Sequence, residues 1–183
     1  FVEGTYKVTD QIKITAGGRY TYDERDLSVT NSTGFQLFGA PASFTDSASF
    51  RAFTPRFVLA WDNGPVNVFY SYTRGFKAGG FSTPAPFPGN SINPEKVFNH
   101  EVGIKNSALG GKLRSSLAVF YYKNKGLQQQ IIDATGAGTR TENVGAAEGY
   151  GAELEINGDP MRGLVLGASL AYLNAKYDSY PNA

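Results

Sequence analysis

The chain has 183 residues, and its 17 Lys and Arg nearly balance its 16 Asp and Glu, so no basic surface for nucleic acid is expected. It contains no cysteine and no run of about 18 apolar residues, which excludes disulfide frameworks, thiolate metal sites and membrane-spanning helices. Its 22 glycines, 13 Phe and 11 Tyr are typical of a curved β-sheet with aromatic girdles.

Strand-like segments follow one another along the whole chain. We expect eight of them, at 2–8, 12–26, 51–61, 66–81, 95–106, 112–131, 139–157 and 163–179. Most exceed the usual strand length of about 5–6 residues. From Val66 to Tyr72 every second residue is large and apolar or aromatic. Such strands suit a wall between lipid and water, because a transmembrane strand needs about 9–11 residues.

The connections between these segments alternate in length. The short ones are 9–11, 62–65, 107–111 and 158–162, and the long ones between them are 27–50, 82–94 and 133–138. In an antiparallel up-and-down sheet, alternate connections lie at opposite ends, and outer-membrane barrels have short periplasmic turns and long extracellular loops. The pattern therefore predicts an all-β, antiparallel up-and-down transmembrane β-barrel with its long loops outside.

Alternate positions of each segment differ in polarity. In 12–26 the even residues, such as Ile12 and Ile14, are lipid-compatible, whereas odd ones such as Lys13 and Arg19 are polar. We expect the apolar parity to face lipid and the charged parity to face the lumen. A soluble lipocalin-like carrier would reverse these faces, and parity by itself does not distinguish the two.

The sequence offers few candidate catalytic residues. His100, the single histidine, falls on the lipid-facing parity beside Val102 and Ile104, and no other residues complete a metal or nucleophile site around it. Glu153 and Glu155 share a face, as the carboxylates of glycosidases do, but we interpret them as lumen charges. We expect no enzyme activity, no cofactor and no metal site.

The long-loop end is the expected ligand site. Loop 27–50 carries phenylalanines and loop 82–94 carries Pro84, Pro86, Phe87 and Pro88, a semi-rigid aromatic rim. Cations near that rim would attract an anionic ligand. The predicted ligand-binding residues at this extracellular mouth are Arg74, Lys77, Phe81, Phe87, Gln128, Gln130, Arg140 and Glu142. Alternatively, these loops merely cover the barrel or contact lipopolysaccharide.

Several motifs occur in a characteristic order. They are RGFKAGGF at 74–81, INPEK at 92–96, EVGIK at 101–105, RSSLAVFYY at 114–122 and EGYGAELE at 148–155. With these motifs the whole chain resembles the barrel of a TonB-dependent outer-membrane receptor. The resemblance implies a 22-stranded barrel of the bacterial outer membrane, closed by an N-terminal plug domain. It also implies uptake of scarce nutrients, most often ferric siderophores, with energy from TonB.

Residues 1–183 are expected to be a partial barrel domain of this kind, with about eight consecutive strands and without the plug and the C-terminal strands. The implied partners are outer-membrane lipid and lipopolysaccharide, a ferric siderophore-like ligand and, through the plug of the parent protein, the TonB complex. A different interpretation is a self-contained eight-stranded barrel with a structural, adhesive or lipid-related role. In that barrel the first strand would pair with the last.

Overall fold

The computed structural model describes residues 1–82, 87–132 and 139–179, and nearly all of them lie in strands. The long strands are β1 (Val2–Lys7), β2 (Ile12–Thr30), β3 (Ser43–Asp62), β4 (Val66–Lys77), β7 (Glu95–Ala108), β8 (Leu113–Lys125), β11 (Ala146–Met161) and β12 (Leu164–Ser179). The short elements are β5 (Gly80–Phe81), β6 (Ser91–Ile92), β9 (Gln128–Ile132), β10 (Thr139–Asn143), helix α1 (Thr33–Leu37) and a 3₁₀ turn at Leu109–Gly111. Among the described residues no helix is long and apolar enough to cross a membrane.

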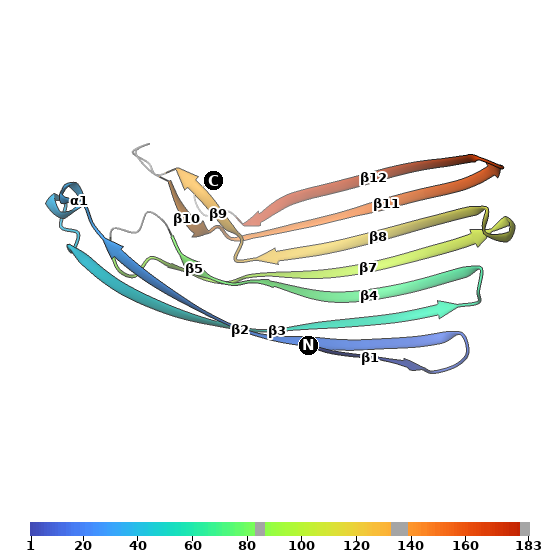
Figure 1. Cartoon of the computed structure of the whole chain (residues 1–183), viewed down its shortest axis with the longest axis horizontal. Coiled ribbons are helices and arrows are strands. Elements are labelled where there is room, and N and C mark those ends of the chain that lie inside the picture. Colours follow the sequence, from blue (N-terminus) through green and yellow to red (C-terminus); the bar gives the residue numbers. More distant parts are fainter. Residues whose placement is uncertain (83–86, 133–138, 180–183) are drawn as a thin grey trace.

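The long strands form one antiparallel sheet in the order β1-β2-β3-β4-β7-β8-β11-β12 (Figure 1). Each long strand pairs with the next long strand along the chain. The short hairpins β5–β6 and β9–β10 lie between long strands in the sequence and form two small sheets of their own. This topology confirms the expected antiparallel, up-and-down all-β fold. In the described part of the chain, β1 and β12 are the two edges of an open sheet, so the pairing required for a closed eight-stranded barrel is not observed.

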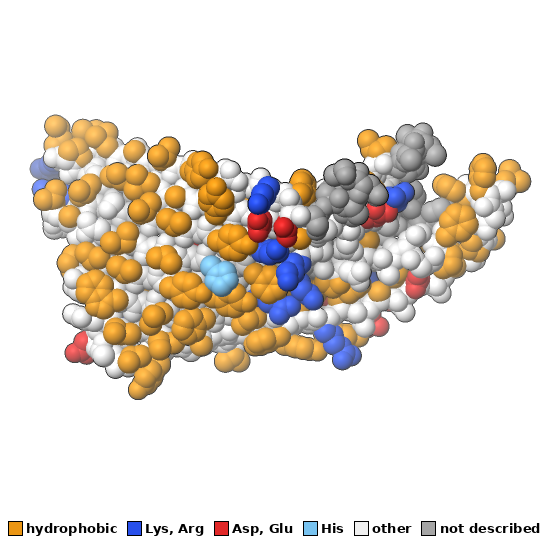
Figure 2. Space-filling view, turned by 180° about the vertical axis from the view of Figure 1, so that it is seen from behind, with side chains coloured by type: hydrophobic (Ala, Val, Ile, Leu, Met, Phe, Trp, Pro, Cys, Tyr) orange, Lys and Arg blue, Asp and Glu red, His pale blue; other side chains and the backbone are white. Residues whose placement is uncertain are grey.

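One face of the sheet carries aligned apolar rows. The register places in one row Ile14, Leu59, Tyr70, Val102, Val119, Ala152 and Tyr172. Val102 is 55% exposed and Val119 is 53% exposed. Figure 2 shows apolar side chains spread over the half of this face nearer the short turns. The predicted parity is confirmed, and so broad an exposed apolar face requires an apolar surrounding.

The opposite face carries paired charges and some aromatic rings. Lys13 lies 3.6 Å from Asp62, and Arg56 lies 2.7 Å from Glu3. Lys13 and Asp62 lie on the adjacent strands β2 and β3, whereas Arg56 on β3 reaches across β2 to Glu3 on β1. On this face a Cβ added to Gly103 would lie 2.5 Å from the Phe69 ring, so this inward ring covers the glycine closely.

The expected loop 27–50 is mostly strand. β2 continues to Thr30 and β3 begins at Ser43, and the two pair without interruption as far as Thr30 and Ser43. The expectation was wrong because the outward positions beyond the membrane wall, such as Glu24, Asp26 and Ser47, are polar. The apolar outward row therefore stops while the backbone ladder continues. The connection itself contains α1, and the Asn31 N–H donates to the Ala42 carbonyl at 2.9 Å.

Three expected strands are interrupted near the same end of the sheet. Segment 66–81 stops at Lys77 and resumes as β5, segment 112–131 divides into β8 and β9, and segment 139–157 divides into β10 and β11. The last two breaks fall at Gly126 and Gly145, whose φ angles are +67° and +64°. A positive φ cannot continue a strand, and alternation alone does not reveal it. The other boundaries differ by a few residues, as fraying strand ends do.

Candidate functional site

The long connections come together at one end of the sheet (Figure 1). This end carries the β2–β3 projection with α1, the β5–β6 hairpin and the β9–β10 hairpin. The other end carries the tight turns β1–β2, β3–β4, β7–β8 and β11–β12. The alternation predicted from connection length is therefore present in space, although the first long connection is shorter than expected.

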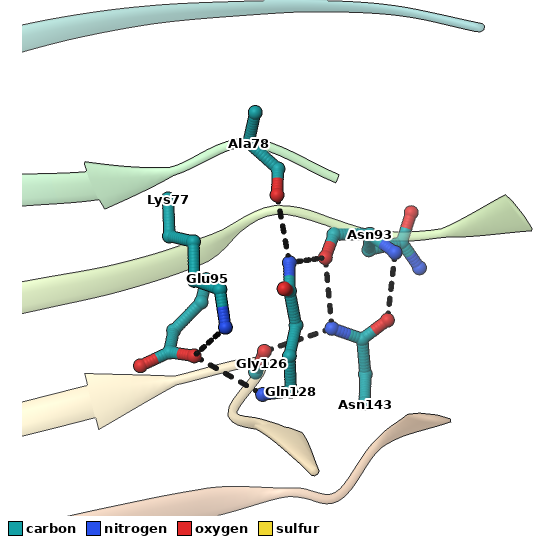
Figure 3. A network of polar contacts seen from close by, with 7 residues as sticks. All are labelled: Lys77, Ala78, Asn93, Glu95, Gly126, Gln128 and Asn143. Carbon is teal, nitrogen blue, oxygen red and sulfur yellow. Dashed lines mark hydrogen bonds and ion pairs between the residues drawn. The ribbon is translucent and has the colours of Figure 1, made fainter. Parts of the chain in front are cut away.

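Gln128, one of the predicted ligand residues, joins three separate segments at this end (Figure 3). Its side-chain Nε2 donates to the carbonyl oxygens of Ala78 and Asn93, each at 2.9 Å. Its backbone N–H donates to Glu95 Oε2 at 3.1 Å, and Lys77 Nζ lies 4.0 Å from the same oxygen. Gln128 thus connects the chain after β4, the start of β7 and the start of β9.

Asn143 completes the same network from β10. Its Nδ2 donates to the carbonyl oxygens of Asn93 at 2.9 Å and Gly126 at 2.8 Å, and its Oδ1 accepts from the Asn93 N–H at 2.7 Å. We call Gln128, Asn143, Asn93 and Glu95 the mouth clamp. Since a hydrogen-bonded amide side chain has few other rotamers available, the clamp holds two loops in one relative position.

The β9–β10 hairpin leaves the sheet at a double bend. Gly126 donates its N–H to the Gly145 carbonyl at 3.0 Å, and Val144 donates its N–H to the Leu127 carbonyl at 2.7 Å. The Val144 side chain is 3% exposed, one of the few buried apolar side chains in the described structure. Beyond the bend, the Thr141 N–H donates to Ser82 Oγ at 2.8 Å, which joins this hairpin to the chain after β5.

The other predicted ligand residues have varied surroundings. Gln130 Nε2 donates to Thr139 Oγ1 at 3.0 Å across the hairpin, and Arg140 forms an ion pair with Glu142. Phe81 is half-buried in β5, whereas Phe87 is 42% exposed. Pro84 and Pro86 lie outside the described residues. Lys77, Gln130 and Arg140 thus keep exposed polar groups at the mouth, and Gln128 is committed to the clamp.

Arg74 and His100 lie on the outward parity. Arg74 belongs to the same parity of β4 as Tyr70 and Tyr72, and its Cζ lies 5.2 Å from the centre of the Phe98 ring. His100 Nδ1 is 2.9 Å from the Tyr70 hydroxyl oxygen. The outward position of His100 agrees with the sequence prediction. Arg74 was grouped with the mouth residues because of its place in the chain, although its parity directs its side chain away from the lumen.

Asn93, Asn143 and Ser82 were not among the predicted site residues. Each is a small polar residue at a strand end or bend, where its side chain can hydrogen-bond the backbone. That composition is the signal that the sequence offered, but it does not identify partners that lie 50 or more residues away. Only the packed loops bring these residues together.

The inner face holds two polar hollows, one toward each end. Near the mouth, a hollow of about 370 Å³ is lined by residues that include Arg19, Asp23, Arg25 and Thr54, and part of Arg74 also borders it. The Asp23 carboxylate, 2.9 Å from Arg25, raises the pKa of the Arg25 guanidinium above its ordinary value, first through the hydrogen bond and then through charge. A larger hollow, of about 440 Å³, lies near the short turns.

Comparison with known proteins identifies the family. The family model described as "TonB dependent receptor-like, beta-barrel" matches residues 1–183. The chain belongs to the TonB-dependent receptor family. It is 30% identical over 161 residues to the metal-pseudopaline receptor CntO of Pseudomonas aeruginosa (strain UCBPP-PA14), an alignment that covers 87% of this chain and 21% of CntO. It is 27% identical over 177 residues to the ferric-pyoverdine BN7/BN8 receptor of Pseudomonas putida, an alignment that covers 94% of this chain and 20% of that receptor.

Among solved structures, the fold is similar to the ferric yersiniabactin uptake receptor FyuA from Yersinia pestis. The TM-score is 0.77 at 20% sequence identity, and the match covers 97% of this chain and 27% of FyuA. The chain therefore spans about a fifth of the length of the curated receptors it matches. Its described strands correspond to part of a TonB-dependent receptor barrel.

Membership of this family sets the orientation of the sheet. TonB-dependent receptors are outer-membrane β-barrel proteins, so the apolar outward rows face lipid and the charged parity faces the lumen. The soluble lipocalin-like alternative, which reverses these faces, is thereby set aside. The mouth clamp lies at the long-loop end, which outer-membrane barrels direct to the extracellular side.

Proposed function

We propose that this chain supplies part of the barrel wall and of the extracellular mouth of a receptor for TonB-dependent uptake of a ferric siderophore or a similar bulky nutrient. In this proposal the plug and the remaining strands are contributed by the rest of the receptor polypeptide, and TonB acts through the plug. The family match over all 183 residues carries the proposal. The curated relatives, named as receptors for metal-pseudopaline and ferric-pyoverdine, support a metal chelate as cargo.

The exposed cations at the mouth favour an anionic ligand. Lys77 projects from the end of β4, with its side chain 63% exposed, and Arg140 projects from β10, with its side chain 51% exposed. Both retain accessible N–H donors, although Glu95 and Glu142 lie beside them. Phe87 adds an exposed ring at the same end. The mouth clamp joins the loops that carry these two cations and this aromatic ring. Together they would bind a bulky anionic chelate at the mouth.

The test uses the full-length receptor that contains this chain. The double variant Lys77→Ala with Arg140→Ala should weaken binding of an anionic ferric chelate by about 100-fold or more, because charge-assisted hydrogen bonds contribute about 1.5–3 kcal/mol each and the variant removes both donors. A matched control replaces one Lys and one Arg at the short-turn end, Lys112→Ala with Arg162→Ala, and should bind as the parent does. Undiminished binding by the first variant would remove these two residues from the proposal.

A further inference from the structure

Two aromatic rings of β8 cover the neighbouring strand on the inner face of the sheet. The rings of Phe120 and Tyr122 are stacked, with centroids 6.4 Å apart and an interplanar angle of 20°. The register places Phe120 opposite Gly151 and Tyr122 opposite Gly149, both on β11. A Cβ added to either glycine would lie 2.6 Å from the opposite ring, so each ring lies between its glycine and the lumen. We call Phe120 and Tyr122 the ring platform.

A third inward ring differs from the ring platform in what lies over it. Phe69 on β4 covers Gly103 in the same way, but the Nζ of Lys105 lies 5.5 Å from the centre of its ring. In the described part of the chain no Lys or Arg lies over the ring of Phe120 or Tyr122. The ring platform therefore presents to the lumen two π faces that no described cation takes.

The ring platform lies just below the mouth. Between its two residues, Tyr121 points outward and is the cross-strand partner of His100 and Tyr150. Aromatic rings with a polar tip settle where hydrocarbon meets water, so this outward row marks the end of the membrane wall. β8 itself ends at Lys125, shortly before Gln128 of the mouth clamp. The ring platform is thus at the level where cargo held by the mouth would meet the inner wall.

The inner face at this level has a charged half and an uncharged half. Toward β2 and β3, the row of Tyr122 runs through Asn99 and Thr73 to Arg56, beside the hollow that Arg19 and Arg25 line. Glu101, opposite Phe120 on β7, is the nearest inward charge on that side. Toward β12, the two rows continue through uncharged residues, which are Gly149, Gly151, Leu173 and Ala175.

We propose that the ring platform binds a planar aromatic ring of the cargo, so that the substrate class of the receptor is a metal chelate that carries such a ring. This inference rests on the proposed uptake function and names the class of its substrate. A ring of the cargo would stack on Phe120 or Tyr122, while its anionic part would lie toward the cations of the mouth. A chelate without a ring would find neither charge nor a matching π face on the uncharged half.

The experiment titrates the full-length receptor in detergent with two ferric trihydroxamates and measures their affinities by calorimetry. Both probes carry the same iron-binding groups and the same carboxylate, but one has benzoyl groups and the other has cyclohexanecarbonyl groups. The probes therefore differ in π character and not in charge. The parent receptor should bind the benzoyl probe about two- to tenfold more tightly, the range expected for one aromatic pair beyond the burial of apolar area.

Variants separate stacking from a structural role of the rings. Phe120→Leu with Tyr122→Leu should bind the two probes equally, because leucine keeps an apolar side chain over each glycine but has no π face. Tyr122→Phe keeps the ring and should keep the preference for the benzoyl probe. Phe69→Leu is the matched control, since it removes an inward ring whose open side Lys105 already covers, and it should also keep the preference. If the double variant does not insert, Tyr122→Leu alone should still reduce the preference.

Three results would each overturn the proposal. They are a parent receptor that binds neither probe or both equally, a double leucine variant that keeps the preference, and a Phe69→Leu variant that loses it. A plug that covers the ring platform would give the first result. Lys77→Ala with Arg140→Ala should weaken both probes equally, because they carry the same charge. Failure of the ring platform is thereby distinguished from failure of the proposed mouth cations.

Discussion

The wall and the mouth of this sheet use the same strands with different side-chain chemistry. In the wall, outward rows such as Val102 and Val119 remain more than half exposed because lipid, not protein, covers them. In the mouth, β2 and β3 continue as a ladder whose outward face is polar, and the β9–β10 hairpin is held by the mouth clamp. The strands of the wall are therefore held in place by the surrounding membrane, whereas the loops of the mouth are held in place by individual hydrogen bonds.

This difference determines how each region responds to substitution. A wall residue interacts with a fluid phase, so the cost of a change depends on its polarity and its depth more than on its shape. A mouth residue has named partners, so removing one atom group leaves others unpaired. Variants placed in the two regions should separate these behaviours in the full-length receptor.

The largest effect is expected in the wall. Leu117→Arg places a charge on the lipid-facing parity of β8 and should reduce the free energy of folding into a bilayer by about 2–4 kcal/mol. Ser116→Arg, the adjacent inward position, should cost much less, because the lumen admits water. Urea unfolding of the receptor in lipid vesicles measures both values. Equal losses for the two variants would contradict the assigned faces.

A smaller effect is expected where the mouth packs closely. A Cβ at Gly79 would collide with the Ile92 carbonyl oxygen and the Phe50 ring, whereas a Cβ at Gly80 would meet nothing within 4 Å. Gly79→Ala should destabilise the β5–β6 region by about 1–3 kcal/mol, the usual cost of overpacking. Amide hydrogen exchange of Ser82, whose N–H donates to Asn90, reports this loss. Gly80→Ala is the matched control, and an equal change in both variants would refute the close contact.

The mouth clamp should lose about 1–2 kcal/mol of local stability in Asn143→Ala, since three hydrogen bonds are removed and the Asn93 N–H loses its acceptor. Faster exchange of the Asn93 amide measures the change. Gln130→Ala removes one bond across the same hairpin and should leave Asn93 unaffected. If Asn93 exchanged at the parent rate in Asn143→Ala, the clamp would not hold the loops together.

The smallest effect concerns acid stability of the β3–β4 turn. The Gly64 N–H donates to Asp62 at 2.9 Å and, with the charge of Lys13, lowers the pKa of the Asp62 carboxyl below its ordinary 3.8. The stabilisation is complete above the ordinary pKa and is lost as pH falls through the lowered value. Asp62→Asn should therefore flatten the fall in urea midpoint between about pH 5 and pH 2. An unchanged pH profile in this variant would show that Asp62 contributes nothing.

The strand alternation predicted the fold and its two faces from residues such as Ile14, Val102 and Glu153, because side-chain direction in a strand has a period of two. The same rule was not enough for the mouth. Arg74 has outward parity, yet its place near the end of β4 suggested the ligand site. Gln128 was correctly placed near the mouth, but its role in the clamp depends on Ala78 and Asn93, which are distant in sequence.

By itself, the sequence determined an antiparallel sheet with lipid-compatible and charged faces, short turns at one end and long connections at the other. These features follow from local periodicity and turn composition, which neighbouring residues control. The tertiary structure decided how far β2 and β3 project, where Gly126 and Gly145 bend the chain, and which loops the clamp joins. It also brought Arg74 and Lys125 over the Phe98 ring, because cross-strand register brings together residues that the chain separates.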